Sequence, residues 1–238
     1  MKTVFSAIMK RSRSYAAQPL FTFFRDERID PVQRFAFCPY VAFFALSFGD
    51  INRHVLRDDT SSDAYQQMIN VHTEEDDHHW QWFLEDVAKL GFDQSMSSMD
   101  WLSLLWHEQT APTRLITYNL VSLLRPLESV LRLVVMESIE ETGNVFFGAL
   151  AQAADEFQRK TGTELRFFGS YHLDKESGHL VGSDHRNLAA IELSDAQRAE
   201  GLRLVDQVFG WFEAWSGDIL SYLEGRSAPA GEHRLTPL

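Results

Sequence analysis

The stretch SSDAYQQMINVHTEEDDHHWQWFLEDVAKL, residues 61–90, decides the fold because its polar and apolar residues repeat with the period of an α-helix. A solvated stripe follows one side of this helix and consists of Gln67, Asn70, Glu74, Asp77, Gln81 and Glu85. The opposite side, which should face the core, holds Met68, His72, Glu75, His79, Asp86 and Leu90. We therefore expect one helix with two histidines and two carboxylates on its inner face, and with Asp76 on or beside the solvated side.

The rest of the chain follows the same period. Apolar residues recur at spacings of three and four nearly everywhere, and no alternating β-branched stretch lies between tight-turn signals. No internal repeat or low-complexity linker divides the chain. The sequence predicts an all-α fold of about seven helices, with a single domain over residues 1–225 and a flexible C-terminal tail over residues 226–238.

Charge and composition argue against several classes of function. The 238 residues include 22 Lys and Arg against 34 Asp and Glu, a net charge of −12, which argues against a nucleic-acid groove. The longest apolar run, residues 35–48, is shorter than the roughly 18–20 residues that a membrane span needs. The N-terminus lacks the order of charges of a signal peptide, and Cys38 is the single cysteine. We expect a cytoplasmic protein without nucleic-acid or membrane partners.

Two further segments place polar residues on apolar faces. In the helix that starts near Pro126, Glu137 and Glu141 continue the apolar stripe across from Arg132, whereas Glu140 turns toward the flank. In FFGSYHLDKESGHLVG, residues 167–182, three side chains share one face at positions i, i+4 and i+7: His172, Glu176 and His179. Three helices thus carry inward His and Glu residues.

Inward carboxylates require compensation, because a buried unpaired charge costs several kcal/mol and a whole domain is stable by only about 5–15 kcal/mol. Protonated histidines, salt bridges from elsewhere or metal ions would each supply it. Carboxylate and imidazole without thiolate are typical ligands of non-haem iron or manganese, and helix bundles build di-iron sites from such residues.

These motifs resemble the haem-oxygenase-like fold superfamily, specifically its non-haem dinuclear iron oxidase and oxygenase branch, which is related to TenA-type proteins. The resemblance lies in HTEEDDHHWQWFLEDVAKLG (72–91), MESIEE (136–141) and HLDKESGH (172–179). It implies metal ligands at Glu75, His79, Glu141, His172, Glu176 and His179. His72 is the alternative to Glu75, because it stands where the family has its first carboxylate, and Glu137 is the alternative to Glu141.

The resemblance also implies a bundle of about seven helices that binds two irons per chain, with manganese as the other metal, and uses O₂ as co-substrate to oxidise a small molecule. Asp86 would orient the histidine ring N–H groups. A reductase would be a partner. The substrate pocket would be apolar and lined by Phe83, Phe147, Phe168 and Tyr171.

Other interpretations stay open at this stage. A haem enzyme would need a proximal histidine and a Gly-rich distal helix, and a cysteine-dependent thiamin hydrolase would need Cys38 as its nucleophile. A non-enzymatic ligand-binding or scaffold protein would hold the same polar residues as a metal-free buried network. The late helix, residues 195–224, carries more large apolar residues than one stripe should bury, which favours a homodimer.

Overall fold

The computed structural model describes residues 1–94, 97–173 and 188–227, and these residues form helices and loops with no strand. Of the described residues 78% are helical, and eight helices among them have seven or more residues, which confirms the prediction of an all-α fold. Within the described ranges, no helix is both long and apolar enough to cross a membrane.

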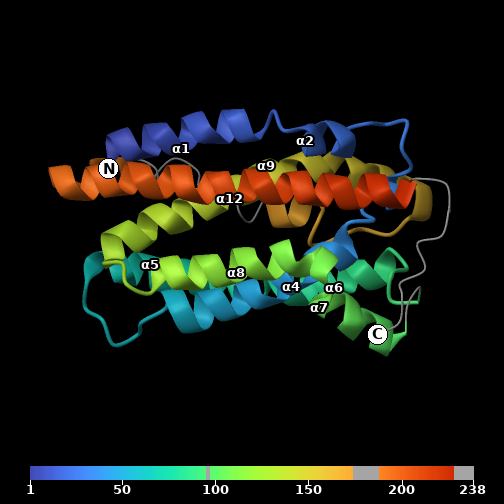
Figure 1. Ribbon diagram of the computed structural model, residues 1–238, viewed down its shortest axis with the longest axis horizontal. Coiled ribbons are helices and arrows are strands. Elements are labelled where there is room, and N and C mark those ends of the chain that lie inside the picture. The colour runs from blue at the N-terminus through green and yellow to red at the C-terminus, as the bar shows by residue number, and fades with distance from the viewer. Residues whose placement is uncertain (95–96, 174–187, 228–238) are drawn as a thin grey trace.

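The helices run along the long axis of the molecule (Figure 1). The N-terminal elements are α1 (Lys2–Tyr15), α2 (Pro19–Phe24), α3 (Pro31–Arg34), α4 (Cys38–Ile51), the π-helical turn η1 (Asn52–Leu56), α5 (Ala64–Asp76) and α6 (His79–Lys89). They are followed by α7 (Ser98–Trp106), the 3-10 turn η2 (Glu108–Thr110), α8 (Ala111–Leu124), α9 (Ser129–Thr161) and α12 (Asp195–Ser227). α1 and α12 lie side by side along one edge, and α4, α6, α7 and α8 lie on the opposite side (Figure 1).

The two longest helices, α9 and α12, have 33 residues each and pack against each other. α9 begins after the break predicted at Arg125-Pro126 and ends at Gly162, whose positive φ of 75° is a backbone conformation that glycine adopts without strain. α12 packs against α1, α2, α8 and α9. α5 packs against α9, which brings the predicted site residues of the two helices together.

The many large apolar side chains of α12 are buried within the chain itself. Leu204, Val208, Phe209 and Ile219 are completely buried, and Phe212 and Trp215 are at most 7% exposed. A helix that is apolar on most sides belongs in a core, and here α1, α8 and α9 cover it. The observation that favoured a homodimer therefore has a different cause, because these side chains are covered within one protomer.

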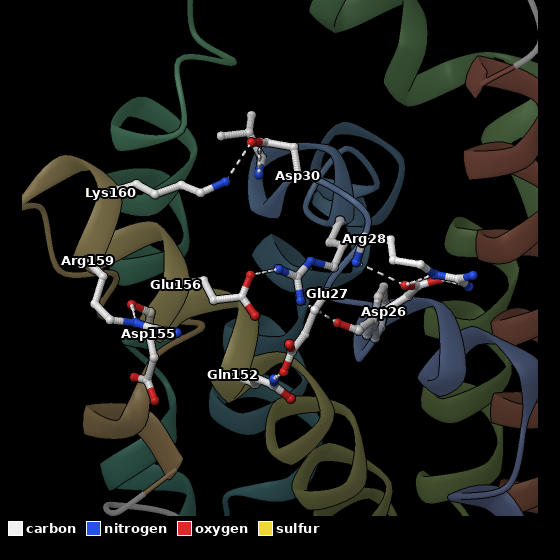
Figure 2. A network of polar contacts seen from close by, with 12 residues as sticks. Asp26, Glu27, Arg28, Asp30, Gln152, Asp155, Glu156, Arg159 and Lys160 are labelled. Atoms are coloured by element: carbon white, nitrogen blue, oxygen red, sulfur yellow. Dashed lines mark hydrogen bonds and ion pairs between the residues drawn. The ribbon is translucent and has the colours of Figure 1, made fainter.

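A polar network fastens the C-terminal end of α9 to the segment before α3 (Figure 2). The guanidinium of Arg34 is fully buried, forms an ion pair with Glu156 and donates to the carbonyl of Phe24 at 3.2 Å. Nearer the surface, Lys160 lies 3.0 Å from the carboxylate of Asp30, and Gln152 donates to Glu27. The buried ion pair is the part of this network that water cannot replace.

Replacing Arg34 by Met should lower the free energy of unfolding by about 3 kcal/mol, because the change leaves Glu156 without its cation in a largely buried position. Urea denaturation measures this loss. Arg28→Met is the matched control, since the Arg28 side chain is 89% exposed in its ion pair with Asp26 and should leave the unfolding midpoint unchanged. Equal midpoints for the two variants would contradict the structural role of Arg34.

Candidate metal centre

The helix predicted over residues 61–90 is broken in the middle. α5 ends at Asp76 and α6 begins at His79, with Asp77 and His78 between them. The constant turn of 100° per residue that phases a helix holds only while the helix is uninterrupted. Asp76, which the single-helix pattern placed toward solvent, is consequently only 2% exposed, so that prediction was wrong.

The break is fixed by close packing on α4. A Cβ atom on Gly49 would lie 2.8 Å from the carbonyl oxygen of Asp77 and 3.0 Å from Cδ1 of Trp80, so only glycine allows this approach. Burial favours the neutral acid at Asp77, but the guanidiniums of Arg57 and Arg53 outweigh it and lower the pKa of this carboxyl. Asp77 thus pairs with Arg53 of η1 and with Arg57 just after it, whereas Asp76 is buried in the bundle.

Three side chains meet behind this break and could hold a metal ion: His72, Asp76 and Glu140. Nε2 of His72 lies 2.9 Å from Oδ2 of Asp76 and 3.1 Å from Oε1 of Glu140, and the three potential ligand atoms all lie within 4.8 Å of one another. Asp76 and Glu140 are 2% and 8% exposed. Two acids from α5 and α9 therefore face one imidazole in a nearly dry site.

Asp76 carries the clearest mark of a binding site. Both of its carboxylate oxygens are buried, and the nearest nitrogen that the structure places beside them is Nε2 of His72, 2.9 Å from Oδ2. A buried carboxylate with so few donors is costly, and native proteins rarely contain one without a further partner. Two donor atoms at roughly 2.0–2.2 Å from one ion, at right angles, lie about 3 Å apart, which is also the length of a hydrogen bond. The separations from Nε2 of His72 to the two carboxylates therefore suit a shared proton in the metal-free protein and a metal ion in its place.

Two further histidines adjoin this triad. Nε2 of His172 lies 3.1 Å from Nδ1 of His79, which itself lies 3.7 Å from Oδ1 of Asp76. Nδ1 of His172 is 2.8 Å from the carbonyl of Phe167, and a carbonyl only accepts, so Nδ1 of His172 donates. His172 therefore turns Nε2 toward His79. The predicted ligands His79 and His172 do come together, beside His72.

The sequence predicted that Asp86 contacts the histidine rings directly, but the structure shows it bonded to the backbone of a neighbouring loop. This fully buried carboxylate accepts the backbone N–H groups of Arg166 at 2.8 Å, Phe167 at 2.7 Å and Phe168 at 3.1 Å, and it pairs with Lys89. Its described partners include no histidine ring. Burial raises the pKa of Asp86, against the backbone donors and Lys89. Asp86 instead holds the loop whose Phe167 carbonyl orients His172.

The glutamate of α9 that meets the triad is Glu140, which the sequence pattern placed on the flank. Glu141 instead accepts a 2.6 Å hydrogen bond from the hydroxyl of Ser12, so it faces α1. Glu137 is half-buried and Glu75 is exposed, so the prediction of an inward Glu75 was wrong, and neither residue is a member of the triad. The expectation failed because α9 is covered by α1, α5 and α12 and has more than one buried side. Glu176 and His179 lie outside the described residues.

One sequence signal for Asp76 was available. His72 and Asp76 stand four residues apart, the spacing that places two side chains on one helical face and that singled out His172 with Glu176. Phasing across the break concealed this signal. Glu140 had no comparable signal, because its role depends on which side of α9 receives α5.

A cavity of about 120 Å³ opens beside the triad and the two histidines. Asp76, His79, Glu140 and His172 line one end, and aromatic side chains dominate the rest. Phe147 and Phe168, two of the residues predicted for the substrate pocket, are in the lining of this cavity. Phe83 instead packs in the core against Phe167 and Phe168, and Tyr171 is 38% exposed and packs on Trp82.

The charge of the triad makes the metal-free protein sensitive to pH. Burial alone would lower the pKa of His72, but the negative charges of Glu140 and Asp76 outweigh it and raise this pKa well above the ordinary 6.5. A raised pKa in the folded state stabilises the fold fully below the unfolded value, and the stabilisation is lost as pH rises through the folded value.

We expect the stability difference between the metal-free protein and His72→Asn to be largest below about pH 6.5 and to shrink at higher pH. Urea denaturation across this range measures it, and a difference independent of pH would contradict the ion pairing. Because a metal must displace the same proton, its affinity should rise with pH.

Gly49→Ala should lower the free energy of unfolding by about 1–3 kcal/mol and weaken metal binding, because the added Cβ pushes α4 away from the α5–α6 break. Gly148→Ala on α9 is the control: no atom lies within 4 Å of its Cβ position, and alanine in a helix should stabilise by about 0.5–1 kcal/mol. Denaturation and metal titration of both variants test this. Unchanged metal affinity in Gly49→Ala would show that the break does not position the site.

Comparisons with known proteins assign no family to the chain. No protein-family model matches it, and no curated protein matches it. The resemblance to the haem-oxygenase-like superfamily consequently stays a prediction. An all-helical fold and a buried His/Asp/Glu group that could hold a metal are the findings from which a function can be argued.

Proposed function

We propose that the protein is a metal-dependent oxidoreductase that binds iron through His72, Asp76 and Glu140 and uses O₂ to oxidise a small molecule. The observation that carries this proposal is the pair of buried carboxylates, Asp76 and Glu140, which both face the single imidazole of His72 at hydrogen-bond distance. A divalent cation would balance the two carboxylates. Imidazole and carboxylate donors favour iron or manganese among the common metals.

Iron in such a site supplies the activation of O₂, and the chain supplies the surroundings. His79 and His172 lie next to the triad and are positioned to hold a second ion, with Glu176 and His179 as the predicted further ligands. Asp86 fixes His172 through the backbone of Phe167. The aromatic walls exclude water from the cavity end where substrate would meet the ligands.

The second candidate is a metal-free ligand-binding protein. In that case the imidazolium of His72 would neutralise part of the charge of Asp76 and Glu140, which the raised pKa of His72 favours. One imidazolium against two carboxylates leaves a net negative charge, whereas a divalent cation with neutral His72 leaves none. The full compensation is the reason why we prefer the metal.

The two other interpretations fit the structure less well. A porphyrin is far larger than a cavity of about 120 Å³. Cys38 is completely buried, and burial, with a smaller contribution from Asp86, raises the pKa of its thiol well above the ordinary value. A nucleophilic cysteine needs the opposite shift.

Anaerobic addition of Fe(II) to the metal-free protein should load about two irons per chain, and admission of O₂ should change the visible absorption. Glu140→Gln should weaken binding by at least about tenfold and abolish that change, because it removes an anionic ligand. Glu141→Gln is the matched control on the next residue of α9, and it should leave both unchanged because Glu141 faces Ser12.

The titration also separates the two candidates. Absence of tight Fe(II) or Mn(II) binding, together with stability that is unaffected by either ion, would overturn the oxidoreductase proposal in favour of the metal-free network. Preferential loading with manganese would change the metal and keep the site. Equal effects of Glu140→Gln and Glu141→Gln would place the metal elsewhere.

A further inference from the structure

The walls of the cavity restrict what the protein can bind. Away from the metal-ligand end they are built by α1, α4, α9 and α12 from large apolar side chains, which include Phe44, Phe48, Phe146, Phe212 and Trp215. Ring contacts fix several of these walls: Phe44 lies 4.9 Å from Trp215 and 5.9 Å from Phe212, centroid to centroid. Rings that pack against one another in this way form a preshaped site.

The cavity is partly open, and its volume limits the part of a ligand that the walls can enclose. An engineered apolar cavity of about 150 Å³ in another protein accepts benzene. The present cavity, at about 120 Å³, matches a molecule of one ring or a similarly short chain. A fused two-ring system or a long acyl chain would require the aromatic walls to move.

Three polar groups of the walls outside the metal-ligand end are already engaged with the protein. The hydroxyl of Tyr15 shares a 3.0 Å hydrogen bond with Ser216, and the indole N–H of Trp215 donates to the hydroxyl of Thr113 at 3.1 Å. Thr142 donates to the carbonyl of Ile139 at 2.7 Å. A ligand that enters would have to break these bonds before it could use the donors, so polar ligand groups gain little here.

Charge adds a second restriction. The lining includes Asp76 and Glu140 but, within the described residues, no lysine or arginine. A carboxylate or phosphate on the ligand would lose its hydration among aromatic rings and would gain no cation in return. Asp76 and Glu140 would in addition repel an anion, so the described part of the lining disfavours anionic ligands.

We propose that this cavity takes an apolar molecule without an anionic group, of about the size of a single aromatic ring, bound with one edge toward Asp76, Glu140 and the two histidines. Its role as the substrate rests on the proposed function. Its binding does not depend on that function, because we infer it from the cavity walls alone.

Three fluorinated probes test the proposal by ¹⁹F NMR titration of the metal-free full chain. Fluorobenzene should bind, 4-fluorobenzoate should bind at least about tenfold more weakly because of its charge, and 1-fluoronaphthalene should bind weakly because of its size. Fluorobenzoate that binds as well as fluorobenzene, in the metal-free or the Fe(II)-loaded protein, would overturn the charge restriction. Failure of fluorobenzene to bind would overturn the whole inference.

Paired variants show whether the probe occupies this cavity. Ala45→Leu fills space inside it and should abolish fluorobenzene binding, whereas Ala199→Leu makes the same change on the exposed side of α12 and should not. Phe44→Ala removes a wall ring and should let 1-fluoronaphthalene bind. Binding that survives Ala45→Leu would refute the assignment, and Phe44→Ala keeps the test informative where Ala45→Leu does not fold.

The outcomes separate this inference from the proposed function. Fluorobenzene binding without tight Fe(II) binding would leave the ligand class standing and remove the oxidoreductase. Fe(II) binding without fluorobenzene binding would overturn the ligand class and leave the metal site of the proposed function standing.

Discussion

The structure depends on how two buried carboxylates are tolerated beside one imidazole. Asp76 and Glu140 are almost completely enclosed, and a charge in such surroundings is costly unless another charge or a metal compensates it. His72 alone cannot neutralise both. The break between α5 and α6, the close approach at Gly49 and the packing of α5 on α9 all serve to hold these groups together. A fold selected only for stability would have placed apolar residues there.

A third buried carboxylate, that of Asp86, has a structural role. Asp86 is saturated by three backbone N–H groups and Lys89, so it is satisfied without a ligand. It anchors the loop at residues 166–168 and so sets the orientation of His172. Asp86 is held by three backbone donors and a lysine, whereas Asp76 shares one imidazole with Glu140, and this contrast distinguishes a structural acid from a candidate metal ligand.

The sequence predicted the helical class, the start of α9 shortly after Pro126 and the extent of α12, because these follow from the helical periodicity and from the proline. The sequence also identified His72, His79 and His172 as candidate metal ligands. Asp76 and Glu140 could not be found in the same way. The α5–α6 break carries no proline or glycine of its own and is fixed by Gly49, far away in sequence, and the exposed side of α9 depends on its neighbours.

The position of the metal itself tests the central claim most directly. Crystals of the protein loaded anaerobically with Fe(II) would locate iron by its anomalous scattering. The account predicts an iron within about 2.0–2.3 Å of Nε2 of His72 and of carboxylate oxygens of Asp76 and Glu140. Iron bound only at exposed acids, with His72 still in direct contact with both carboxylates, would contradict it.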